Sequence, residues 1–200
     1  MRVYRLCKDK YSKRVLDGEG GRVADGRWHT QGRRIVYCAS SEALAVLEVR
    51  VHVGRHVPRV PYAMHMIHVP DEHIVTLLAE ELPEHWNTVP YATASQRIGD
   101  EWLVSARSAA LQVPSVHSNS DTSLLLNPAH PDFQHIRVLS RAPYTFDRRL
   151  FGRRSGVTQH PHVSSCPPRT EPAGGGAAGC GVLGLGGPPL LALRGRPWPA

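Results

Sequence analysis

The chain changes character abruptly at Gly152, and this break limits how much of it can form a packed domain. From Gly152 to the C-terminus lie 11 of the 18 glycines and 8 of the 17 prolines. Such a stretch cannot bury enough apolar surface to offset the entropy that it loses on ordering. We therefore predict one domain in residues 1–151, long enough for a hydrophobic core, and a low-complexity, disordered Gly/Pro-rich tail in residues 152–200.

The hydrophobic pattern of residues 1–151 mixes the periods of helices and strands. Ser40 or Ser41 caps a helix predicted over residues 42–51, and a second helix is predicted over residues 96–111. Alternation or short β-branched runs predict strands at residues 2–6, 35–38, 62–69, 111–116, 123–126, 136–139 and 144–146. The domain is therefore expected to be of the α+β class.

The positive charge is concentrated in the predicted tail. The chain carries a net charge of +7, but five arginines and a single acid, Glu171, lie beyond residue 151, so only three of the seven charges belong to the domain. A domain this weakly basic, with no recognition motif, is not expected to bind nucleic acid directly.

Cysteine usage and hydropathy indicate the compartment. The four cysteines contain no C-x-x-C pair and do not form a disulfide framework. No apolar run approaches the roughly 18 residues that cross a bilayer, and no leader peptide precedes the first predicted strand. We expect a cytoplasmic protein without a membrane partner.

The turn of residues 25–32 places a guanidinium beside an indole, Arg27 and Trp28, between two glycines. Glycine lets the backbone approach a ligand closely, and a guanidinium can grip a phosphate with two hydrogen bonds. The turn is therefore a candidate site for an anionic ligand with a flat ring. The alternative is a surface arginine stacked on Trp28.

Three further side chains are candidates for the same site. Glu48 is the one acid in an apolar helical run, where a carboxylate is either desolvated and functional or exposed and paired with a neighbouring cation. Tyr37 ends a predicted strand and offers a ring and a hydroxyl, or it is a core tyrosine. Ser115 follows Pro114, whose fixed φ could hold it toward a ligand; no G-x-S-x-G elbow surrounds it, which argues against a hydrolase nucleophile.

Motifs for a metal or for a common nucleotide fold are absent from the sequence. Residues 1–151 contain ten histidines but no H-E-x-x-H, and no cysteine has metal-ligand spacing. Neither a P-loop nor a G-x-G-x-x-G is present. We therefore expect no metal site and no Rossmann or P-loop site.

Taken in order, these segments resemble the RES domain family, named for its Arg, Glu and Ser. The resemblance covers roughly residues 1–151. It rests on Arg2-Val3-Tyr4-Arg5, Gly26-Arg27-Trp28-His29, Val36-Tyr37, residues 43–48, residues 98–102, Val113-Pro114-Ser115, residues 125–133 and residues 146–150.

The resemblance implies a fold and an activity. The fold would be similar to ADP-ribosyltransferases of the diphtheria-toxin type, with packed β-sheets and flanking helices. The protein would be the toxin of a type II toxin–antitoxin system, degrading NAD+ by cleaving the nicotinamide–ribose bond, with water or phosphate as acceptor. NAD+ would be the substrate, and no cofactor is implied.

The resemblance also implies roles and partners. Arg27, Trp28, Tyr37 and Ser115 would bind NAD+, and Glu48 would stabilise the cationic transition state, as a carboxylate does in glycoside cleavage. The expected protein partner is an antitoxin with a helix-turn-helix domain of the Xre type, and a homodimer within the complex is also expected.

Two alternatives remain. The ADP-ribose could be transferred to a protein target, since the four site residues do not decide the acceptor. The chain could also be a catalytically weakened binding module, because His29 and Ser123 stand where the family usually has Asn.

Overall fold

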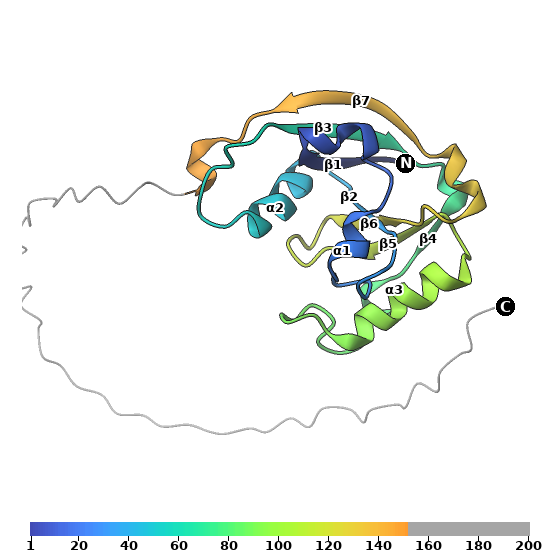
Figure 1. Cartoon of the computed structure of the whole chain (residues 1–200). Helices are drawn as coiled ribbons and strands as arrows, with labels where there is room; N and C mark the ends of the chain where they lie inside the picture. Colours follow the sequence, from blue (N-terminus) through green and yellow to red (C-terminus); the bar gives the residue numbers. More distant parts are fainter. Residues whose placement is uncertain (152–200) are drawn as a thin grey trace, which may run out of the picture. The chain divides into compact units, whose positions relative to one another are not determined.

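The computed structural model describes residues 1–151, and these form one mixed sheet with a few helices (Figure 1). The predicted tail of residues 152–200 lies outside the described residues. The sheet has seven strands in the order β4-β5-β6-β2-β1-β3-β7, which confirms the α+β class. The strands are β1 (Arg2–Lys8), β2 (Val36–Ala39), β3 (Tyr62–His68), β4 (Ile74–Thr76), β5 (Ala110–Pro114), β6 (Thr122–Leu126) and β7 (Arg137–Tyr144). The helices are α1 (Gly20–Val23), α2 (Glu42–His52) and α3 (Thr93–Ser105).

The two longer helices cover the same face of the sheet. Alternation along β2 directs Tyr37 and Ala39 to this face and Val36 and Cys38 to the other. On the first face, α2 packs on β1 and β3 through a cluster that includes Leu44, and α3 packs on β5 and β6 through Trp102. In Figure 1, α2 lies beneath β1 and β3 and α3 beneath β4 and β5, with α1 drawn between the two helices. We call this the helical face.

The opposite face carries its own core without a long helix. Val3, Val36, Ile67, Leu124 and other buried residues form it. It is covered by short connections, including Phe133 and Ile136 from the segment between β6 and β7.

The start of α2 agrees with the prediction, whereas the end of α3 does not. The Ser41 hydroxyl accepts a hydrogen bond from the Leu44 amide and caps α2. The prediction that the second helix runs to residue 111 was wrong: α3 ends at Ser105 because Ala106 takes a left-handed conformation, with φ 47°. Ser108 then accepts from the Trp102 indole N–H at 2.9 Å, which fixes the turn into β5.

A single strand, β7, takes the place of the last two predicted strands, residues 136–139 and 144–146; residues 136, 145 and 146 lie outside it. β7 runs through Pro143, which has no amide hydrogen to donate to the ladder. Because β7 is an edge strand paired only with β3, Pro143 interrupts no central ladder. The short parallel strand β4 was not predicted, since its three residues show too little alternation.

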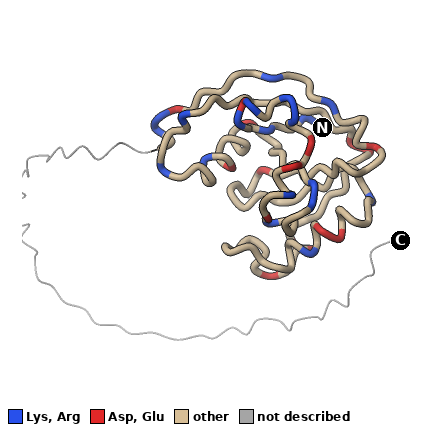
Figure 2. The backbone as a smooth tube through the Cα atoms, viewed as in Figure 1, with Lys and Arg blue, Asp and Glu red and all other residues tan. Residues whose placement is uncertain are grey.

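Charged residues of both signs occur throughout the described part of the chain. Lys and Arg are interspersed with Asp and Glu along the backbone of residues 1–151 (Figure 2). Among these residues, no helix is both long and apolar enough to cross a membrane.

Candidate functional site

The turn of residues 25–32 is held in shape by its own backbone and by α3. The Gly26 amide donates to the His29 carbonyl at 3.0 Å. From α3, the Gln96 side chain donates to the Gly26 carbonyl at 3.1 Å, and Asp100 accepts from the amide and the hydroxyl of Thr30. The turn is therefore fixed before any ligand arrives.

Gly99 lets α3 approach this turn closely. A Cβ placed on Gly99 would lie 1.8 Å from the carbonyl oxygen of Trp28. Only a glycine allows two backbones so near each other. The Trp28 ring is buried and lies 5.8 Å, centroid to centroid, from Trp86, so it is part of the core and not an exposed stacking surface.

A hydrogen-bond network joins the turn to β2 through Tyr37. The Tyr37 hydroxyl lies 2.7 Å from His29 Nδ1 and accepts from the Trp28 amide at 3.3 Å. His29 Nε2 lies 3.0 Å from the Ala24 carbonyl, which can only accept, so Nε2 carries the proton and Nδ1 accepts from Tyr37. Burial lowers the pKa of His29 and raises the pKa of Tyr37. At neutral pH both groups are neutral, and the network is complete.

Arg27 points from the turn toward the segment that precedes α3. Its Nη1 donates to the carbonyls of Trp86 and Thr88 at 2.7 and 3.0 Å, and its guanidinium lies 5.2 Å from the Tyr91 ring centroid. Burial lowers the pKa of Arg27, while the charges of Tyr91 and Glu48 act in the opposite direction. Arg27 is thus a half-buried cation, and protein carbonyls already use part of its capacity to donate hydrogen bonds.

Glu48 lies on α2 with its carboxylate 35% exposed, at the wet edge of the helix. Its Oε2 is 3.6 Å from Nε2 of His117, from the loop after β5. The carboxylate is also close enough to contribute to the raised pKa of Tyr37, after burial and other nearby groups. Of the two arrangements weighed from the sequence, Glu48 is therefore nearer to the exposed one, although the neighbouring imidazole comes from His117 and not from its own helix.

Ser115 begins the loop that carries His117. Its hydroxyl accepts from the His117 amide at 3.0 Å, so the serine orients the backbone of this loop. The other end of the loop is tied to the start of α2, because Asp121 accepts from Ser40 at 3.0 Å. These contacts hold the loop that carries His117 against the start of α2, the helix that carries Glu48.

The structure brings Arg27, Tyr37, Glu48 and Ser115 to the helical face, from the turn, β2, α2 and the end of β5. Ser123 of β6 points to this face too, because it pairs with Ala39 and Val113 in the sheet. The Trp28 side chain is instead buried in the core and anchors the turn there. A shallow surface hollow along α3 is lined by other residues, among them Thr30 and Arg97, and is not the candidate site.

Sequence reasoning missed three side chains at this site. His117 lies two residues after Ser115, and its position near a predicted serine was the only available signal. Trp86 and Tyr91 come from residues 82–92, a loop whose sequence shows no pattern that would place it over Arg27.

The sequence is similar to known proteins over most of residues 1–151. The family model described as "RES domain" matches residues 2–147. A protein named "Toxin Res" from Photorhabdus laumondii subsp. laumondii is 38% identical over 151 residues, covering 75% of this chain and 97% of that protein. A protein from Sphingobium sp. (strain YBL2) named "Prs ADP-ribosylating toxin" is 38% identical over 153 residues, covering 74% and 94%.

The fold is similar to a solved structure as well. The crystal structure of the M. tuberculosis MbcT–MbcA toxin–antitoxin complex contains a chain that matches with a TM-score of 0.62 and 17% identity. The match covers 75% of this chain and 86% of that chain. At this identity the likeness concerns the fold alone.

Proposed function

The chain belongs to the RES domain family, and on this premise we propose that it is the toxin of a toxin–antitoxin pair and degrades NAD+ by cleaving the bond between nicotinamide and ribose. Water or phosphate is the acceptor. The relatives named as toxins support the first part, since nearly their whole length is matched. The chemistry of the helical face supports the second.

One observation carries the proposal: a half-buried cation, a neutral phenol and a carboxylate, Arg27, Tyr37 and Glu48, lie near enough to act on one another electrostatically. Arg27 suits the diphosphate, because a guanidinium binds phosphate oxygens well. To bind there it exchanges the carbonyls of Trp86 and Thr88 for the ligand. Tyr37 offers the edge of its ring to the nicotinamide or its ribose, since its hydroxyl is already used inside the protein.

Glu48 is suited to the bond-breaking step. When the glycosidic bond breaks, its electron pair leaves with nicotinamide and positive charge develops on the ribose. A carboxylate facing that charge stabilises the transition state more than the ground state. The acceptor oxygen then bonds to the ribose carbon and its proton is released. His117 lies beside this carboxylate, and Ser115 holds the loop of His117, which limits where the acceptor can stand.

The buried network argues against the weakened-module alternative. An Asn side chain in place of His29 would supply one acceptor and a donor group. His29 supplies one acceptor to Tyr37 and one donor to Ala24. His29, standing where the family usually has Asn, therefore leaves no group of this network without a partner.

The test follows nicotinamide release from NAD+ by the purified full chain. Glu48→Gln keeps the shape but removes the charge, and we expect release to fall about a hundredfold or more. Glu42→Gln, on the exposed first turn of the same helix, is the matched control and should retain the wild-type rate. If the wild type releases no nicotinamide, or if Glu48→Gln releases it at the wild-type rate, the proposal is wrong.

A second candidate is transfer of ADP-ribose to a protein, favoured by the name of the Sphingobium relative. That relative and the Photorhabdus one are equally similar to this chain, so the comparison does not rank the two reactions. Labelled NAD+ separates them: free ADP-ribose or its phosphate indicates degradation, whereas label retained on protein indicates transfer.

The proposed partner is an antitoxin with an Xre-type helix-turn-helix domain, and the toxin is expected to form a homodimer within that complex in the cytoplasm. The structural match to a toxin–antitoxin complex supports a protein partner of this kind. Co-expression with the neighbouring reading frame should restore growth that expression of this chain alone arrests. Purification of the pair and its mass in solution test the stoichiometry.

A further inference from the structure

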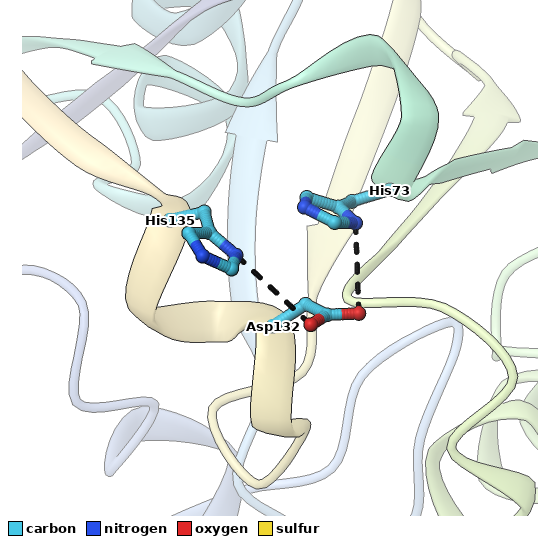
Figure 3. A group of neighbouring side chains, drawn as sticks. All are labelled: His73, Asp132 and His135. Atoms are coloured by element: carbon cyan, nitrogen blue, oxygen red, sulfur yellow. Dashed lines mark ion pairs between the residues drawn. The ribbon is translucent and has the colours of Figure 1, made fainter.

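Two histidines and an aspartate from distant segments meet at the surface near the N-terminus. His73 comes from the 3₁₀ helix η2 (Asp71–His73), and Asp132 and His135 come from η4 (Pro131–His135). Figure 3 shows both imidazoles directed at the Asp132 carboxylate, one from each side. One ligand atom from each residue lies within 4.8 Å of the others. We call this the His73 cluster.

The backbone around the cluster is held in place independently of any ion. The N-terminal amine bonds the Val69 carbonyl at 2.7 Å and pairs with Asp71, which fixes η2. On the other side, Nδ1 of His130 accepts from the Asp132 amide at 3.1 Å and caps η4. The His73 and His135 rings lie parallel, 5.2 Å apart, with 14° between their planes.

The distances between the polar atoms of the His73 cluster are compatible with a bound metal ion. Nδ1 of His73 lies 3.6 Å from Asp132 Oδ2, and Nδ1 of His135 lies 4.0 Å from Oδ1. Both separations exceed a hydrogen bond. With metal–ligand bonds of about 2.0–2.1 Å in a tetrahedral site, two ligand atoms lie about 3.4 Å apart, so small side-chain movements would fit an ion.

We propose that His73, Asp132 and His135 form a binding site for a divalent transition-metal ion of the zinc class. Two imidazole nitrogens and a carboxylate oxygen are ligands that zinc accepts, and a water would complete the tetrahedron. His130 is not a ligand through Nδ1, because that atom already accepts from the backbone. A hard ion such as Mg²⁺ is disfavoured, since it prefers oxygen ligands.

The ion would act as a clip between two connections of the sheet. His73 precedes β4 and the other two ligands precede β7, so the ion joins segments about 60 residues apart. Phe133 beside the cluster packs on the core of the face opposite to the helical face. The site is thus separate from Arg27, Tyr37 and Glu48, and its role is structural. It does not depend on the proposed NAD+ reaction.

No metal site was expected from the sequence, and the fold shows why the sequence could not signal the proposed one. The Asp132 and His135 pair, three residues apart, is too common to signal a site, and His73 joins it only through the fold. No spacing rule could connect them.

The test uses the full chain, freed of metal with a chelator and titrated calorimetrically with ZnCl2. Because His160, His162, Cys166 and Cys180 could also bind zinc, variants are compared with the wild type. We expect His135→Ala and Asp132→Asn each to lose one equivalent of bound zinc, or to bind it at least about tenfold more weakly. His85→Ala, at an exposed histidine elsewhere, should bind as the wild type does.

Thermal unfolding gives a second readout. Zinc at about 100 times its wild-type dissociation constant should raise the wild-type midpoint by roughly 5 °C, and in both cluster variants this rise should fall to about half or less. His135 is exposed and Asn has the shape of Asp, so both variants are expected to fold, which circular dichroism without zinc checks. Equal stoichiometry, affinity and midpoint shift in the wild type and both variants would overturn the proposal, as would no zinc-dependent rise in the wild type.

Discussion

At the residue scale, the Tyr37 hydroxyl couples the turn of residues 25–32 to the sheet. It uses its lone pair and its proton inside the protein, toward the Trp28 amide and His29 Nδ1. In the proposed site, Tyr37 would therefore contact the ligand through its ring. A mutation at Tyr37 could therefore change stability by removing the hydroxyl, or change ligand binding by altering the ring.

Tyr37→Phe removes only the hydroxyl. The buried Trp28 amide and His29 Nδ1 then lose a partner, and we expect a loss of about 1–3 kcal/mol in the free energy of unfolding. Urea unfolding of the full chain measures this loss. Tyr144→Phe is the control, because no hydrogen bond in residues 1–151 is recorded for that hydroxyl. An unchanged midpoint for Tyr37→Phe would show that the network contributes little.

His29 should make stability depend on pH. Burial lowers its pKa in the folded state, so as the pH falls the unfolded chain takes up this proton first. The stability that neutral His29 contributes is present above about pH 6.5, the ordinary histidine pKa, and is lost as the pH falls through its lowered folded-state value. Buried His65, whose pKa burial also lowers, acts in the same direction.

His29→Gln tests this dependence. We expect the decline in unfolding free energy between pH 7 and pH 5 to become shallower, without disappearing, because His65 remains. His85→Gln, at an exposed position, should leave the slope as it is. A slope for His29→Gln equal to that of the wild type would mean that His29 does not carry the effect.

At the scale of elements, α3 determines where the turn stands. Its backbone touches Trp28 at Gly99, and its Gln96 and Asp100 bond the turn on either side. The helix could be predicted from its apolar period, but its contact with the turn could not. A glycine inside a helix indicates that another segment packs closely against it, but it does not identify that segment.

Gly99→Ala should displace the helix from the turn. The added methyl carbon would meet the Trp28 carbonyl at 1.8 Å, and backbone cannot move aside as a side chain does. We expect a loss of about 3 kcal/mol in unfolding free energy. Gly20→Ala, where nothing lies within 4 Å of the new carbon, is the matched control and should be neutral or slightly stabilising. Similar stabilities of the two variants would contradict the close approach.

The sequence predicted elements best where a local signal marked their ends. Ser41 marked the start of α2 correctly. The end of α3 was missed because Ala106 shows no tendency toward the left-handed conformation that stops the helix. β7 was predicted as two shorter strands, and the edge position that tolerates Pro143 within it is a property of the whole sheet.

At the scale of the whole molecule, the sheet decides which distant residues meet. The family and the fold class could be recognised from segments in order along the chain, and both are confirmed. Arg27, Tyr37, Glu48 and Ser115 were named from those segments, and their roles stay a prediction. His117 and the His73 cluster could not be found this way, because their partners are set by which strands lie side by side.

The described domain closes on Phe151, four residues beyond the family match. This ring is buried against Phe146, with 5.6 Å between centroids, and the Arg50 guanidinium of α2 lies 4.6 Å above it. Arg50 also donates to the Leu150 carbonyl at 2.6 Å. Residues 148–151 therefore cover part of the core beneath α2, although they contribute no strand or long helix.

Two truncations test where the domain ends. A chain ending at Phe151 should unfold at the same urea concentration as the full chain, whereas a chain ending at Asp147 should lose about 3–5 kcal/mol, the usual cost of removing a buried phenylalanine. Phe151→Ala in the full chain separates the ring from the rest of the segment and should account for most of that loss. If the chain ending at Phe151 is as unstable as the one ending at Asp147, residues beyond 151 belong to the fold, and the predicted boundary is wrong.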